Sequence, residues 1–163
     1  MITFRNITRE NFDTIVDLKV NDDQLAFMEG PLYSLAECTF EDSYIAKAIY
    51  NDETVVGFIL YYFVSDDPDY VYLHRFMIDK SQQGKGLGKA AILASLDMFK
   101  TEFPSIECVE LMHYSDNKAG AAAYAALGFE PTGENRESGP CRCELGTTNP
   151  ERYTEIVRRK YYK

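Results

Sequence analysis

The sequence predicts an α/β (α+β) fold in which a mixed central sheet of about six to seven strands is flanked by helices. Two observations support this class. Segments that alternate apolar and polar side chains, as half-buried strands do, are interleaved with segments whose apolar residues recur at helical spacing. The early strands follow one another through a short turn, whereas the later ones are separated by helices. With 163 residues and 45% hydrophobic content the chain can bury one core, so residues 1–163 are expected to form a single domain.

The N-terminal segments predict one strand and two helices. Residues 2–7 alternate apolar and polar side chains, and a helix is expected over residues 9–20. A short helix over residues 22–29 should turn Leu25 and Met28 toward the core. These helices and the next one, within about residues 9–43, would form one side of the molecule.

A third helix and a hairpin follow. Ser34 and Glu37 have the spacing of a capping box, which predicts that a helix begins there. Residues 44–50 and 54–64 are rich in β-branched and aromatic side chains and flank a short polar turn. They are therefore expected to pair as an antiparallel hairpin.

The second half has the order strand, helix, strand, helix, strand. A long helix is expected after a glycine-rich turn, because apolar residues recur along one face. The expected elements are a strand at 70–78, that helix with Ile92, Leu96, Phe99 and Phe103 on its apolar face, a strand at 106–112, a helix at 116–127, a strand from 128, a polar tail from about 135 and a last strand at 152–162.

The charge is uneven along the chain. In total 17 Lys and Arg oppose 26 Asp and Glu, which gives a net charge of -9. The first 70 residues hold 14 of the acidic residues and only 4 of the basic ones. Because a nucleic-acid-binding surface needs clustered cations, we expect no nucleic-acid partner.

Composition also argues against membrane, secretory and metal-binding classes. The longest apolar run, residues 55–64, is far shorter than the roughly 20 residues of a membrane span, so no membrane partner is expected. The N-terminus lacks the basic start and cleavage site of a secretory signal, which favours a cytoplasmic location. No CxxC pair or histidine cluster is present, so we expect reduced thiols and no metal at the four cysteines, Cys38, Cys108, Cys141 and Cys143.

A glycine-rich turn at residues 83–88, Gln-Gly-Lys-Gly-Leu-Gly, lies between an expected strand and an expected helix. Glycines let the backbone approach an anion, and the free N–H groups at a helix start point toward it. The turn is not a Walker loop, because Lys85 is followed by Gly86 instead of Ser or Thr, and it lacks a Rossmann glycine at Lys89. By itself it fits either a phosphate site or a structural turn.

Two motifs together resemble the GNAT family of N-acetyltransferases. Residues 83–88 match the family's Q/R-x-x-G-x-G/A pyrophosphate loop. About 40 residues later, Asn117-Lys118-Ala119 and the run from Ala123 to Phe129 look like the second signature. The resemblance is strong over residues 70–132, the expected acetyl-CoA-binding core. More loosely, residues 24–29, 34–35 and 56–58 are similar to the small bacterial spermine/spermidine acetyltransferases.

The resemblance implies a V-shaped opening between the strands at 70–78 and 106–112, which would receive acetyl-CoA as co-substrate. Backbone groups of the first strand would pair with the pantetheine amides, and amides of the turn would hold the pyrophosphate. The residues so implied are Phe76, Met77 and Ile78 on the strand and Gln83, Gly84, Lys85, Gly86, Leu87, Gly88 and Lys89 in the turn.

Asn117 and Tyr124 lie seven residues apart on one expected helix, close to the same face, so they can serve one ligand. In the family a tyrosine at the second position gives a proton to the departing coenzyme A thiolate. A phenol with a pKa of about 10 is protonated at neutral pH and suits this role. Tyr124 is therefore the expected general acid.

The family often places a basic carboxylate on the strand at 70–78, where this chain has His74 and Arg75. The proton acceptor for the amine therefore stays open between His74, which could titrate near neutrality, Glu29 and a water chain. Asp22, Asp23 and Glu29 fall in helices that cover the acceptor site in the family and could attract a cation.

The resulting expectation is an acetyl-CoA-dependent N-acetyltransferase that acts on a small cationic amine, spermidine or spermine. Alternatives are the same reaction on an aminoglycoside, a protein lysine or an N-terminus, and an acyl-CoA-binding module without catalysis. The tail at 152–163 either finishes the sheet or is exchanged in a homodimer.

Overall fold

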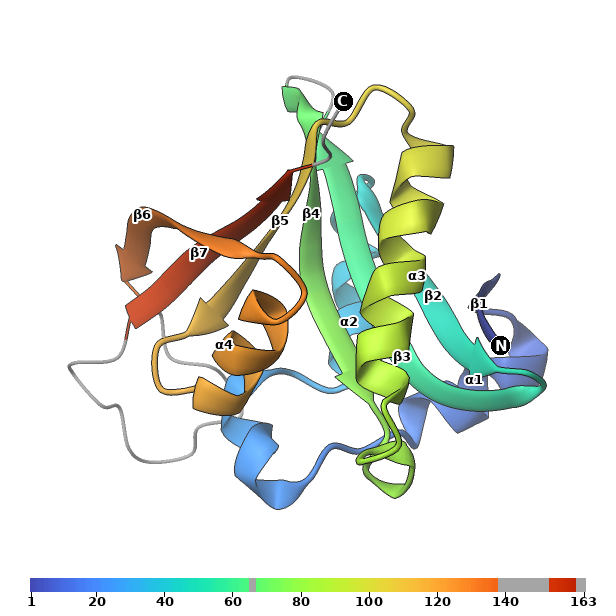
Figure 1. The fold of residues 1–163 in the computed structure, drawn as a ribbon. Helices are drawn as coiled ribbons and strands as arrows, with labels where there is room; N and C mark the ends of the chain where they lie inside the picture. Colours follow the sequence, from blue (N-terminus) through green and yellow to red (C-terminus); the bar gives the residue numbers. More distant parts are fainter. Residues whose placement is uncertain (65–66, 138–152, 161–163) are drawn as a thin grey trace.

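A mixed sheet with the strand order β1-β2-β3-β4-β5-β7-β6 organises the computed structural model, which describes residues 1–64, 67–137 and 153–160 (Figure 1). Neighbouring strands are antiparallel except β4 and β5, which are parallel. This confirms the expected fold class. The strands are β1 (Ile2–Asn6), β2 (Tyr44–Asn51), β3 (Thr54–Val64), β4 (Asp67–Ile78), β5 (Cys108–Tyr114), β6 (Glu130–Glu137) and β7 (Tyr153–Lys160).

Helices cover both faces of the sheet. Ile92, Leu96 and Phe99 of α3 are buried in the core on one face, as the periodicity predicts. Ile15 of α1 belongs to a second core cluster on the other face, where Leu35 of α2 also packs. None of the described helices has both the length and the apolar content to span a membrane. The helices are α1 (Arg9–Val16), η1 (Asp22–Phe27), α2 (Pro31–Glu37), η2 (Lys80–Gln82), α3 (Leu87–Glu102) and α4 (Lys118–Ala125).

Two expectations about the N-terminal helices are wrong. Helix α1 ends at Val16, because the next segment is held by the residues that follow β4: the Lys19 N–H donates to the Asp79 carboxylate at 3.0 Å, and the Lys19 carbonyl accepts from the Lys80 N–H at 2.7 Å. Leu25 is 49% exposed instead of buried, since η1 is a 3-10 helix with three residues per turn, which changes the face that points inward.

The expected capping box at Ser34 is also wrong. Helix α2 begins at Pro31 with Gly30 as its N-cap, because proline has its φ preset for the first helical position. Ser34 lies inside the helix, where its hydroxyl donates to the Gly30 carbonyl at 3.0 Å. Glu37 is consequently the last helical residue, and its side chain is available for contacts with the sheet.

The parallel strands β4 and β5 separate along their length (Figure 1). Their pairing runs from Tyr70 opposite Cys108 to Leu73 opposite Leu111 and does not continue, although both strands do. The register between β3 and β4 shifts at Leu60/Tyr61, where His74 is the extra residue of a bulge. The expected V-shaped opening is thus present, with His74 at its apex.

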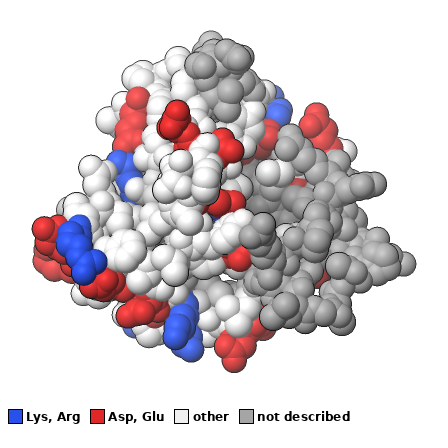
Figure 2. All heavy atoms as spheres, turned by 180° about the vertical axis from the view of Figure 1, so that it is seen from behind, with Lys and Arg blue, Asp and Glu red and all other residues white. Residues whose placement is uncertain are grey.

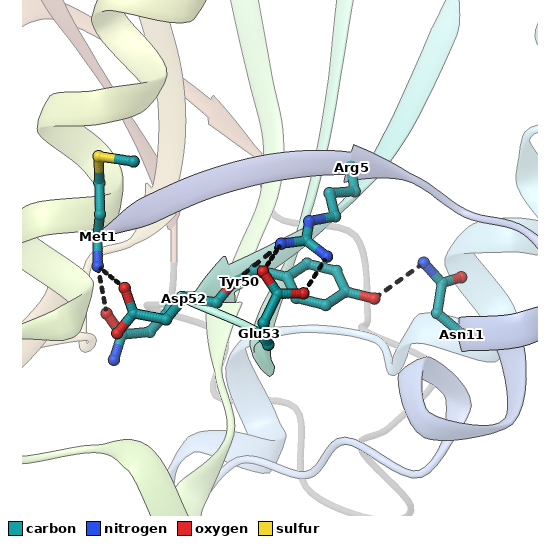
Figure 3. Close-up of polar contacts among 7 residues, drawn as sticks. Met1, Arg5, Asn11, Tyr50, Asp52 and Glu53 are labelled. Carbon is teal, nitrogen blue, oxygen red and sulfur yellow. Dashed lines mark hydrogen bonds and ion pairs between the residues drawn. The ribbon is translucent and has the colours of Figure 1, made fainter.

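A polar network fixes the edge of the sheet far from this opening (Figure 3). The Arg5 guanidinium donates to both Glu53 carboxylate oxygens at 2.9 Å and stacks over the Tyr50 ring at 4.1 Å. Asn11 of α1 donates to the Tyr50 hydroxyl at 3.3 Å. These contacts attach α1 to strands β1 and β2.

Candidate active site

The split between β4 and β5 opens into a cleft of about 830 Å³. Its walls come from the end of β4, the glycine-rich turn, β5, α4 and the segment from η1 to α2. Most of the expected site residues line it, namely Glu29, His74, Phe76, Met77, Ile78, Gln83, Gly84, Gly86, Leu87, Gly88, Asn117 and Tyr124.

Four expected site residues lie outside the cleft lining. Asp22 and Asp23 are exposed in the first turn of η1. Lys85 is exposed, and its ammonium group donates to the Ser81 carbonyl at 2.9 Å within the turn; Lys89 is exposed on α3. From these positions the side chains would act on a ligand in the cleft mainly through longer-range electrostatics.

The β4 wall presents backbone more than side chains. Met77 and Ile78 are 3% and 6% exposed, and beyond Leu73 β4 is not paired with β5. The Ile78 carbonyl accepts a hydrogen bond from the Gln83 side chain at 2.9 Å. Backbone groups alternate between the two sides of a strand, and the Met77 carbonyl faces Gly57 of β3. An extended ligand amide would therefore meet the backbone of Phe76 and Ile78 and not that of Met77.

The turn before α3 leaves the first N–H groups of the helix without a side-chain cap. Gly84 and Gly86 have φ of 75° and 76°, in the left-handed region, and Gly86 is the N-cap of α3 with no side-chain cap. The Gln83 side chain holds the turn in place, because its amide nitrogen donates to the Gln24 side-chain oxygen Oε1 and its own Oε1 accepts from the Asn21 side-chain amide, both at 2.8 Å. The helix N–H groups are thus left for a ligand.

Helix α4 begins at the cleft with Asn117 as its N-cap. The Asn117 side-chain oxygen accepts from the Gly120 N–H at 2.9 Å. A Cβ at Gly120 would lie 2.6 Å from the Asn117 amide nitrogen, so this close cap requires glycine. The sequence reasoning missed Gly120, although its spacing of three from an N-cap asparagine was a usable signal.

Tyr124 projects from α4 into the cleft, half-buried between two rings. Its ring centroid is 6.2 Å from that of His113 and 5.8 Å from that of Phe129. Burial raises the pKa of Tyr124 to about 12, so the phenol keeps its proton across the physiological range. His113 is a second residue that the sequence reasoning missed: it is buried on β5, with its Nε2 3.4 Å from a Glu155 carboxylate oxygen.

The apex of the split holds a cluster of His74, Glu37 and Arg75. Arg75 donates to the Glu37 carboxylate, and His74 Nε2 lies 3.9 Å from the same carboxylate. The His74 ring packs against Tyr44 at 5.0 Å and Tyr62 at 6.0 Å. Within the described chain the buried His74 Nε2 has no hydrogen-bond partner.

His74 does not titrate near neutrality. Burial, and then the adjacent Arg75 guanidinium, lower the pKa of His74 to about 4, while Glu37 opposes this shift. The imidazole is therefore uncharged at neutral pH. Glu37 and Arg75 were not assigned to the site from the sequence, because the supposed capping box accounted for Glu37.

Among the described residues, the cleft lining contains no cysteine and no group of side chains arranged to hold a metal ion. Cys38 is half-buried, and its burial raises the pKa of the thiol; Cys108 is buried in the core. Cys141 and Cys143 lie outside the described residues. In the described ranges, no three His, Cys, Asp or Glu side chains are grouped to hold a metal ion.

A family model, two sequence relatives and a solved structure all relate this chain to acetyltransferases. The model of the acetyltransferase (GNAT) family matches residues 12–129. A probable spermine N(1)-acetyltransferase from Bacillus subtilis subsp. natto is 32% identical over 138 residues, which covers 82% of this chain and 90% of that protein. A spermine/spermidine N(1)-acetyltransferase from Bacillus subtilis strain 168 is 31% identical over 138 residues, with the same coverage. The crystal structure of a Bacillus subtilis acetyltransferase in complex with CoA superposes with a TM-score of 0.71 at 15% identity, covering 99% of this chain and 98% of that one, which shows a shared fold.

Proposed function

This chain belongs to the GNAT acetyltransferase family, and we propose that it transfers the acetyl group of acetyl-CoA to a primary amine of a small polyamine such as spermidine or spermine. One observation carries this proposal. A single cleft joins the glycine-rich turn and Tyr124 to the carboxylate of Glu29. An anionic coenzyme and a cationic acceptor can therefore meet in it.

Acetyl-CoA would lie along the split. The N–H groups at the start of α3, behind Gly84 and Gly86, would bind the pyrophosphate. The pantetheine arm would pair with the backbone of Phe76 and Ile78, which faces away from β3, as an added strand. This orientation brings the thioester toward Tyr124.

The reaction needs no enzyme nucleophile. The neutral amine nitrogen attacks the thioester carbonyl carbon, the carbon–sulfur bond breaks with its electron pair going to sulfur, and the nitrogen releases one proton, which ends on water. Tyr124 gives its proton to the sulfur and later regains one from solvent. The products are the N-acetylated amine and coenzyme A.

The charge distribution supports a polycationic acceptor. Acidic side chains are spread over the side seen from behind, with fewer Lys and Arg side chains interspersed among them (Figure 2). Glu29 lines the cleft and, with the acidic first 70 residues, would attract the ammonium groups that do not react.

Coenzyme A release with a panel of amines tests the proposal. We expect turnover with spermidine and spermine to exceed that with lysine, a lysine peptide and an aminoglycoside at equal concentration. Preference for one of the other amines would contradict the polyamine assignment. Tight acetyl-CoA binding without turnover of any amine would contradict catalysis altogether.

Replacing Glu29 with glutamine should raise the KM for spermine by about five-fold, because one attractive charge at the cleft is removed, equivalent to about 1 kcal/mol. Asp23→Asn is the matched control, since Asp23 is equally acidic but exposed outside the cleft. Initial rates at low and high salt measure both effects, and the KM of the wild type should rise with salt. An equal response of the two variants would contradict the special role of Glu29.

Replacing Gly86 with alanine should weaken coenzyme A binding by about five- to ten-fold. Its φ of 76° costs an alanine roughly 1 kcal/mol or more, so the turn would relax and move the N–H groups at the start of α3. Isothermal titration with coenzyme A measures the change. Lys85→Ala, in the same turn with an exposed side chain, should alter the Kd by less than about three-fold. A stronger effect at Lys85 would make side-chain charge, and not the turn, the main source of affinity.

A further inference from the structure

We propose that Arg75, held in place by Glu37, prevents a further positive charge at the apex of the split, where the acceptor amine would react. Neither His74 nor the reacting nitrogen beside it would then carry a charge before the attack. The inference rests on the proposed transfer to an amine. It concerns the step at which the amine loses its protons, and it makes Arg75 a positioning residue that acts through His74.

His74 lies at the place proposed for the reacting amine. It occupies the bulge at the apex of the split, it lines the cleft with Tyr124, and its Nε2 is buried without a hydrogen-bond partner in the described chain. A small rotation of the ring on amine binding would bring this neutral nitrogen to the cleft, where it can accept a hydrogen bond from an amine N–H. The oriented amine lone pair can then attack the thioester.

His74 is too weak a base to deprotonate an ammonium ion directly. A primary ammonium has a pKa of about 10.4, whereas the pKa of His74 is about 4, so this transfer would be unfavourable by about 10⁶-fold. The first proton must therefore leave to water before the amine binds at the apex. After attack the nitrogen carries a positive charge, and its second proton passes to His74 and on to water.

Arg75 is fixed beside His74. Its side chain is 12% exposed, it donates to the Glu37 carboxylate, and its guanidinium lies 5.8 Å from the Tyr33 ring centroid. Because like charges repel, this guanidinium disfavours an imidazolium at His74 and an ammonium bound next to it. The groups around His74 are Arg75 of β4, Glu37 of α2, Tyr44 of β2 and Tyr62 of β3, so Arg75 is the one cation among the described neighbours.

The cluster thereby divides the two ends of a polyamine. The reacting nitrogen lies beside Arg75 without charge, while the remaining ammonium groups lie toward Glu29 and the acidic surface. In an amine whose charged second nitrogen is very close to the reacting one, that ammonium group would also lie next to Arg75 and would be repelled by it. The site consequently favours diamines with a spacer over compact ones.

Titration of the histidine ring by NMR tests the inference without any acceptor. The chain has two histidines, so the His113→Gln variant assigns the His74 signal. In Arg75→Gln the pKa of His74 should rise by about one unit or more, because a repelling cation is lost and Glu37 remains. Arg75→Lys, which keeps the charge, should give less than half of this shift.

A double variant shows whether the shift in the His74 pKa comes from the lost charge or from disturbed folding. Loss of Arg75 alone leaves the Glu37 carboxylate unpaired in a partly buried position. The double variant Glu37→Gln/Arg75→Gln removes the pair as a whole, and its His74 pKa should exceed that of Glu37→Gln alone. An unchanged His74 titration in folded Arg75→Gln, or in the double variant relative to Glu37→Gln, would overturn the inference.

The pH dependence of kcat/KM for spermidine links the titration to catalysis. In Arg75→Gln the loss of rate at acid pH should begin about one pH unit higher than in the wild type, since His74 must be unprotonated, and Arg75→Lys should restore the wild-type profile. Identical profiles of the Gln and Lys variants would contradict a role of the charge. Absence of turnover with every amine would instead contradict the proposed function and leave the NMR result valid.

Discussion

Replacing Tyr124 with phenylalanine is expected to lower kcat for acetyl transfer to spermidine by about 10²- to 10⁴-fold and to leave the Kd for coenzyme A within about two-fold. Phenylalanine keeps the ring between His113 and Phe129, so packing is retained and only the hydroxyl is lost. Without that proton donor the thiolate must leave as an anion in a cleft of limited polarity. Steady-state kinetics and calorimetric titration with coenzyme A measure the two quantities.

The pH profile gives an independent check on Tyr124. Burial raises its pKa to about 12, and a general acid acts while protonated, so no alkaline loss of rate below about pH 11 should come from this group. Tyr114→Phe, which removes a hydroxyl from the same cleft, should change kcat by less than about five-fold. A rate of Tyr124→Phe equal to that of the wild type would remove Tyr124 from the mechanism.

Local sequence patterns predicted an element correctly where a single pattern was present in the segment. The apolar spacing of Ile92, Leu96 and Phe99 predicted the buried face of α3, and the aromatic and β-branched runs predicted β2 and β3. The V-shaped split followed from the resemblance to a family. Its apex at His74 could not be predicted, because the bulge depends on the register between β3 and β4.

Competition between two local signals explains the error at α2. Gly30-Pro31 and the Ser34/Glu37 spacing both indicate a helix start, and they exclude each other. The wrong choice hid Glu37 from the site. Its partner Arg75 lies 38 residues away, a separation at which no periodic pattern operates.

The distribution of charge along the sequence did not predict which acidic side chains line the cleft. Asp22, Asp23 and Glu29 are close in sequence, and only Glu29 reaches the cleft. The 3-10 geometry of η1 sets the directions of Asp22 and Asp23, and it was not evident from composition. The acidic half therefore did not indicate which of the three carboxylates lines the cleft.

Replacing Gly57 with alanine is expected to destabilise the fold by about 2–3 kcal/mol and to lower Tm by about 5–10 °C. Gly57 lies in β3 opposite Ile78, and a Cβ there would be 2.2 Å from the Met77 carbonyl oxygen and 3.0 Å from the Ile78 Cδ1. A backbone oxygen in a paired strand cannot rotate away, so β4 itself must shift. Thermal unfolding followed by circular dichroism measures the loss.

The same shift should reach the ligand, because Met77 and Ile78 form the β4 wall of the cleft. Coenzyme A binding to folded Gly57→Ala at low temperature should weaken by about ten-fold, as expected when a pre-formed backbone edge is displaced. Gly30→Ala is the matched control: its φ is -71° and nothing lies within 4 Å of a Cβ, so it should cost less than about 1 kcal/mol. Equal Tm values for the two variants would contradict the close approach of β3 and β4. A large loss of stability with unchanged coenzyme A affinity would show that the end of β4 does not hold the ligand, and the pantetheine would then have to lie along β5 and α4.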